Sequence, residues 1–154
     1  MKHGTLRTAT VLLSMLAAGT LALAPVAQAV EPTTATLSFD CGSFGSGEAT
    51  LTATQDGTAA TITVSTSAIT APIPISANSV RSTLTLTKNG SGTTTFAGNA
   101  NPAIPAGSAV STGPLNGTVA AGDSLEATTL TVVVFGITAT CNATSPQNPG
   151  PFVF

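Results

Sequence analysis

The residues of this chain that could do chemistry are few, and its two cysteines come first. Cys41 ends the alternating run Ala35–Cys41, and Cys141 ends the longer apolar run Leu130–Cys141. Two cysteines in an exported protein form a disulfide by default, because the compartment is oxidising. The sequence therefore predicts a Cys41–Cys141 disulfide. The alternative, two free thiols or a metal pair, lacks a histidine ligand because the one histidine, His3, lies in the N-terminal leader.

Catalytic groups are sparse once that leader is removed. No histidine and no free thiol remain to serve as general base or nucleophile. A carboxylate pair such as Asp40 and Glu48, which flank a glycine-rich loop, could resemble the arrangement of a glycosidase or a calcium site. The sequence therefore predicts a non-catalytic protein with no catalytic, cofactor-binding or metal site. The six acidic residues after the leader are Glu31, Asp40, Glu48, Asp56, Asp123 and Glu126.

The N-terminus has the pattern of a secretory signal peptide. Lys2 and Arg7 precede the apolar run Val11–Ala24, and Ala27-Gln28-Ala29 supplies the small residues that signal peptidase recognises. We therefore expect cleavage after Ala29 and secretion, from a chain of bacterial type. No later apolar run reaches the roughly 20 residues needed to cross a bilayer. The predicted organisation is a signal peptide (1–29), a β domain (30–145) and a proline-rich tail (146–154).

Charge excludes two classes of partner. Cleavage leaves 125 residues, in which Arg81 and Lys88 are the only cations against six acids, a formal charge of −4. Such a chain cannot neutralise a phosphate backbone, which excludes nucleic acid, and it has no polybasic patch for anionic lipid. Abundant Val, Ile, Leu and Thr with little charge favour a folded domain over disorder.

Short alternating segments separated by Gly, Asn and Asp turns predict an all-β fold. We expect a single immunoglobulin-like β-sandwich, or a small β-barrel, of about 7–9 antiparallel strands with one disulfide. Asp56-Gly57 gives the clearest hairpin signal, because Asp-Gly suits the positive φ of tight turns. The expected strands are Ala35–Cys41, Glu48–Thr54, Ala59–Thr66, Ile69–Ile75, Ser79–Lys88, Thr93–Ala97, Leu115–Val119 and Leu125–Cys141.

Two of these segments supply a candidate contact surface. Pro72 and Pro74 cannot donate to a sheet ladder, so they predict an edge strand protected against aggregation, or a polyproline-like binding segment. In Leu130–Cys141, interpreted as one strand with a bulge at Gly136, the odd positions form an apolar face. Val132 and Val134 make its other face apolar as well. The candidate contact surface is Val132, Val134, Pro72 and Pro74.

Two loops have more than one interpretation. Phe44, in the glycine-rich loop after Cys41, is either a lid over the end of the core or an exposed contact, and we expect the lid. The segment Gly98–Pro114 is rich in Gly, Asn, Pro and Ala. A connection of that length is functional, disordered or contains a weak strand.

Three functions fit these features. The first is a secreted contact module that binds an unknown protein or cell-envelope component. The second is a carrier of a small apolar ligand. In its acidic, Ala/Gly/Thr/Val-rich composition and its size the chain is similar to the secreted actinomycete apoproteins of the neocarzinostatin type, which carry two disulfides where this chain can form one. That resemblance implies an immunoglobulin-like sandwich that binds a ligand. The third is an enzyme inhibitor that acts through residues 98–114.

Overall fold

The computed structural model describes residues 29–154 and shows a nearly all-β protein with one disulfide. The predicted signal peptide, up to residue 28, lies outside the described residues. The predicted fold class is confirmed. In chain order the elements are β1 (Thr34–Asp40), the short 3-10 turn η1 (Gly42–Phe44), β2 (Ser46–Asp56), β3 (Ala59–Thr70), β4 (Arg81–Lys88), β5 (Gly92–Gly98), β6 (Ala109–Thr118), β7 (Ser124–Val134), β8 (Ile137–Ala143) and β9 (Phe152–Val153).

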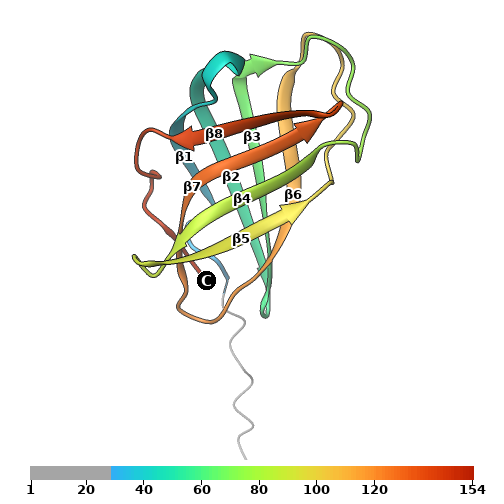
Figure 1. Cartoon of the computed structure of the whole chain (residues 1–154). Helices are drawn as coiled ribbons and strands as arrows, with labels where there is room; N and C mark the ends of the chain where they lie inside the picture. The colour runs from blue at the N-terminus through green and yellow to red at the C-terminus, as the bar shows by residue number, and fades with distance from the viewer. Residues whose placement is uncertain (1–28) are drawn as a thin grey trace, which may run out of the picture.

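Eight of the strands form one sheet that closes on itself. Their order is β4-β5-β6-β3-β2-β1-β8-β7, and β7 pairs with β4 to complete the barrel. β9 adds to β7 beside the ring. Because β3 lies beside β6 and β4 beside β7, the connectivity is of the Greek-key type. In Figure 1 β8, β7, β4 and β5 cross in front of β1, β2, β3 and β6. Of the two architectures predicted, the small barrel is the one that forms.

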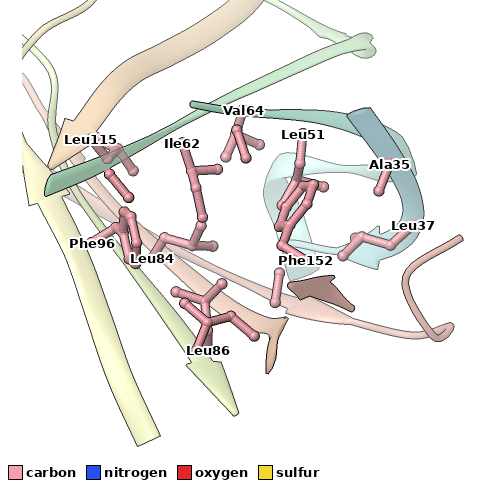
Figure 2. Packing of buried hydrophobic residues seen from close by; sticks show 14 of the residues in the cluster. Ala35, Leu37, Leu51, Ile62, Val64, Leu84, Leu86, Phe96, Leu115 and Phe152 are labelled. Carbon is pink, nitrogen blue, oxygen red and sulfur yellow. The ribbon is translucent and has the colours of Figure 1, made fainter. Parts of the chain in front are cut away.

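Large side chains fill one half of the barrel, which we call the packed half. It lies at the end with the β2–β3, β4–β5 and β6–β7 connections and the C-terminus (Figure 1). Phe96 and Phe154 are in ring contact with centroids 6.3 Å apart, and Phe152 meets Phe154 at 6.4 Å. Leu84, Leu86 and other aliphatic residues point between the two walls onto this group (Figure 2). Tight interdigitation of this kind gives a barrel interior with few voids.

The disulfide closes a short seam. Cys41 and Cys141 are bonded, as the sequence predicts. They follow directly on the two ladder pairs that join β1 to β8, Phe39 with Ala143 and Asp40 with Asn142. Since the other strand pairs around β1 and β8 are longer, the covalent link strengthens the ring where backbone pairing is short.

The segment Leu130–Cys141 is a hairpin, and its interpretation as one strand is wrong. β7 ends at Val134, Phe135 and Gly136 make the turn, and β8 begins at Ile137, which pairs with Val134. Both turn residues have positive φ, 52° and 75°. Positive φ at both central positions defines the type I′ hairpin turn, which favours Asn-Gly or Asp-Gly. Phe-Gly lacks the Asn or Asp of that signal, so Gly136 is the one mark of the turn in this segment of the sequence.

A bulge in β7 sets which of its residues face inward. Thr85 pairs with Thr129 while Leu86 pairs with Ala127, so Thr128 is an extra residue. Ala127 is buried before the bulge, and the even positions from Leu130 onward face inward after it. The expected inward face of β7 at odd positions such as Val133 is therefore wrong for this half of the strand, because the bulge lies at Thr128 and not at Gly136.

Two segments with many prolines belong to the barrel. Phe152 and Phe154, within the predicted tail 146–154, are completely or almost completely buried. Buried Gln147 ties this segment to β7, since its side-chain oxygen accepts the Ala127 N–H at 3.2 Å. Of residues 98–114, the last six belong to β6.

The 71–80 segment connects β3 to β4, so the predicted edge strand does not form. Buried Ile75 exchanges two backbone hydrogen bonds with Ile104, at 2.8 and 2.9 Å. The side-chain oxygen of buried Asn101 accepts the N–H groups of Ser79 and Val80. The 71–80 and 99–108 connections therefore hold each other through these hydrogen bonds.

Candidate functional site

The half of the barrel opposite the packed half is hollow. A cavity of about 350 Å³ lies between the walls there, and residues of β1, β2, β3, β4, β6, β7 and β8 line it. Its floor includes Leu51 and Leu84, at the level where the packed half begins. Its walls include Leu130 and Val132 of β7. Volumes of this size are at the lower end of the range for small-molecule sites.

The cavity lining is apolar and carries no charge among the described residues. Aliphatic, aromatic and sulfur groups supply nearly all of its surface. Several Ser and Thr residues belong to the lining, but the hydroxyl of Thr112 is occupied in a buried hydrogen bond with Ser82. The hydroxyl of Thr128 donates to the Thr85 carbonyl at 3.0 Å. With these hydroxyls engaged, the wall offers packing contacts and few polar ones.

Four exposed apolar side chains surround the opening, and we call them the rim. They are Phe44 of η1, Ile73 of the 71–80 connection, and Phe135 and Ile137 of the β7–β8 hairpin. Their exposed fractions are 46%, 52%, 60% and 54%. Within residues 29–154 the remaining large apolar side chain with comparable exposure is Val153, on β9 at the other end. The exposed apolar groups therefore gather around the cavity opening.

Three of the four residues of the predicted contact surface lie at this cavity. Val132 and Val134 are half-buried and line its wall, so they are neither an exposed strip nor sealed core. Pro72 also lines it, beside Ile73, while Pro74 is exposed and does not. Phe44, for which a lid was expected, is a half-exposed member of the rim.

Sequence reasoning missed Phe135 and Ile137, because it placed them in mid-strand. The signal available was Gly136 within an apolar run, which also marks a turn.

The disulfide forms part of the cavity wall. Both Cys41 and Cys141 line it, together with Phe39, Ala139 and Ala143 of the neighbouring strand positions. The cross-link thereby fixes β1 to β8 beside the opening, where η1 and the rim residue Phe44 follow Cys41.

Within residues 29–154 the ionisable groups lie outside the cavity lining. Asp123 forms an ion pair with Lys88 at 3.0 Å near the packed end, and its carboxylate also accepts the Ala120 N–H at 2.8 Å. That backbone hydrogen bond and Lys88 hold the pKa of Asp123 below its usual value against a smaller desolvation effect. Asp40 accepts the Gly42 N–H at 2.6 Å, and Glu48 lies opposite Ser38 in the β1–β2 ladder. Within residues 29–154 no three potential ligands gather to hold a metal ion.

Known proteins supply no assignment for this cavity. Comparison of the chain with protein-family models, with curated proteins and with solved structures found no match. Among residues 29–154 there is no helix long and apolar enough to cross a membrane.

Proposed function

We propose that this protein binds and carries an uncharged, apolar small molecule in the barrel cavity. The observation that carries the proposal is the open cavity of about 350 Å³ with a charge-free, apolar lining. Ligand sites are concave and mostly apolar. Of the three functions that the sequence suggests, this observation favours the carrier. An adjoining contact surface at the rim is compatible with it.

The physical driving force is the removal of apolar surface from water. An apolar wall offers water few hydrogen-bond partners and therefore favours apolar guests. If each non-hydrogen atom of the ligand occupies the volume of a liquid water molecule, ~30 Å³, the cavity accommodates roughly a dozen such atoms. At about −0.5 kcal/mol per atom, such a ligand gains about −6 kcal/mol, a Kd of tens of micromolar. A longer ligand that reaches the rim would bind more tightly.

The lining also selects against charge. A buried carboxylate or ammonium is costly unless a counter-charge or several hydrogen bonds compensate it. The lining contains no charged side chain in the described part of the chain, and the hydroxyl of Thr112 is already hydrogen-bonded to Ser82. We therefore assign the ligand to hydrocarbons and weakly polar neutral molecules, and we expect a fatty alcohol to bind better than the corresponding fatty acid.

Secretion belongs to the same proposal. Its support is the disulfide, which is typical of oxidising compartments, and the leader pattern that ends at Ala29. Cleavage after Ala29 would make Val30 the first residue, and its side chain is buried in the core. Mass analysis of the exported protein under non-reducing conditions should give residues 30–154 less two hydrogens.

The test is titration of the purified chain with N-phenyl-1-naphthylamine, a neutral probe that fluoresces in apolar surroundings and is long enough to extend from the cavity to the rim. We expect saturable binding, displaced by a neutral alkane or fatty alcohol. Ala139→Phe adds a ring to the cavity wall and should reduce probe affinity at least tenfold. The matched control is Thr140→Phe on the exposed face of the same strand, which should bind like the parent protein. Absence of binding, or equal binding by both variants, would overturn the proposal.

A further inference from the structure

The rim residues have a second feature besides their exposure. They come from three separate segments and yet surround one opening, and their apolar surface continues into the cavity wall through Pro72 and Val134. Scattered exposed apolar residues are ordinary on protein surfaces, but a gathered patch usually marks an interaction site. Exposed large apolar side chains are therefore concentrated at the cavity opening rather than spread over the described surface.

Phe135 is costly to the isolated protein in two ways. Its φ of 52° lies in the left-handed region, where a bulky side chain is a rare outlier. Its side chain is 60% exposed, so burial does not compensate for that strain. At the opposite end of the barrel the chain has Asn89 at a φ of 52°, which is the residue type suited to this conformation. A binding partner that contacts Phe135 would therefore explain an aromatic residue at the tip of the β7–β8 hairpin.

The size and charge of the rim indicate which kind of partner binds it. Four large side chains at about half exposure present on the order of 400 Å² at ~200 Å² each, below the ~800 Å² per partner of a stable protein interface. Among residues 29–154, exposed Asp40 and Glu48 at this end of the barrel outnumber the one cation there, Arg81. The negative balance disfavours anionic lipid, while apolar tips that enter the headgroup region suit a neutral bilayer.

We propose that the rim inserts into the surface of a neutral lipid bilayer and that the cavity takes up its ligand from the lipid. This inference rests on the proposed function, because an apolar ligand partitions into lipid and reaches the cavity most directly through an opening seated on it. Phe135 and Ile137 at the hairpin tip, with Phe44 and Ile73 around it, are the inserted side chains. Asp40 and Glu48 exclude strongly anionic surfaces.

The test uses the tryptophan-free chain with single tryptophans placed as reporters. Phe135→Trp with phosphatidylcholine vesicles should show a blue-shifted emission, quenched by brominated acyl chains. Val153→Trp, at the exposed position on the other end, is the matched control and should remain unquenched. Adding one-third phosphatidylserine should weaken vesicle binding.

Phe135→Asn separates a functional role from a structural one. It should raise the urea midpoint, because asparagine suits the positive φ, and in combination with Ile137→Ser it should lower vesicle co-sedimentation at least tenfold. Co-sedimentation unchanged in the double variant, binding to anionic vesicles alone, or concentration-dependent dimers in place of vesicle binding would overturn the inference. Probe binding in solution is measured in parallel. If the parent protein does not bind the probe, the proposed function is overturned and, with it, ligand uptake from lipid.

Discussion

At the scale of single residues, Asp123 has the clearest electrostatic role. Its carboxylate joins the β6–β7 connection to β4 through the Ala120 N–H and Lys88, and its side chain is almost completely buried. The side-chain amide of Asn89 also donates to it, at 3.3 Å, and the Asn89 Oδ1 accepts the Ser124 N–H at 2.9 Å. These contacts organise one end of the packed half, far from the cavity. The residue is therefore a structural anchor and a suitable control for effects on binding.

The lowered pKa of Asp123 predicts how stability depends on pH. A carboxyl group whose pKa is lower in the folded state binds fewer protons there than in the unfolded chain. Its contribution is complete above the unfolded pKa of about 3.9 and disappears as pH falls through the lower folded pKa. The difference in unfolding free energy between the parent and Asp123→Asn should be constant from pH 7 to pH 5 and shrink below pH 4. Urea titrations measure it, and a difference independent of pH would contradict the assignment.

Gly117 is the residue-scale test of packing. A Cβ added there would lie 2.6 Å from two ring atoms of Phe96, which is fully buried and in contact with Phe154. Gly117→Ala should therefore cost about 1–3 kcal/mol, the usual effect of overpacking. Gly150→Ala, where a Cβ meets nothing within 4 Å, is the control and should change stability by less than about 0.5 kcal/mol.

Adding Phe96→Leu to Gly117→Ala gives a second measurement. The smaller side chain relieves the overlap, so the double variant should be more stable than the sum of the two single effects predicts. Strict additivity of the two effects would show that contact with the Phe96 ring is not the reason why Gly117→Ala is destabilising.

At the scale of elements, the disulfide seam is the feature with the largest expected effect. The bond spans 100 residues of sequence and continues a β1–β8 ladder of two residue pairs. Loss of the loop constraint in Cys41→Ala/Cys141→Ala should cost about 2–4 kcal/mol. Since both residues line the cavity, probe affinity should fall as well, even under conditions where the variant remains folded. Urea unfolding and probe titration of the same sample measure the two effects, and an unchanged midpoint would show that backbone pairing alone holds the seam.

Strand faces could be predicted wherever the alternation is uninterrupted. The β2–β3 hairpin and β4 follow the expected pattern, with Leu51, Ile62 and Leu84 inward. In β7 the pattern fails at Thr128, because the bulge depends on Gln147, twenty residues further along the chain, to satisfy the Ala127 N–H. A distant partner of this kind leaves no local signal. The cavity could not be predicted for the same reason, since closure rests on the β4–β7 pairing, which local sequence does not reveal.

At the scale of the whole molecule, the barrel interior consists of a packed half and a hollow half. All the aromatic residues buried in the packed half come from β5 and from the C-terminal segment, so the last residues of the chain complete the core (Figure 2). The opposite half contains many small side chains, among them Ala71, Ala139 and Ala143, and so encloses space instead. A barrel of eight strands is just wide enough for its side chains to fill it or to leave room for one small ligand. This protein combines the two arrangements in one barrel.

Two leucines of β7 test that division directly. Leu125 is fully buried in the packed half, whereas Leu130 is half-buried in the cavity wall. Leu125→Ala should cost about 2–5 kcal/mol, since it creates a new void in close-packed surroundings. Leu130→Ala should cost less than half as much, because its side chain already borders empty space.

Binding should show the reverse order. Leu130→Ala should change the affinity for the neutral probe, while Leu125→Ala, compared at temperatures where it remains folded, should not. Saturating ligand should also raise the stability of the parent protein, by about 2.7 kcal/mol at one hundred times its Kd. Equal destabilisation by the two substitutions would mean that the cavity region is as tightly packed as the rest. A carrier of small apolar molecules requires a hollow half in which truncating a side chain costs little stability. It also requires a packed half that keeps the barrel folded.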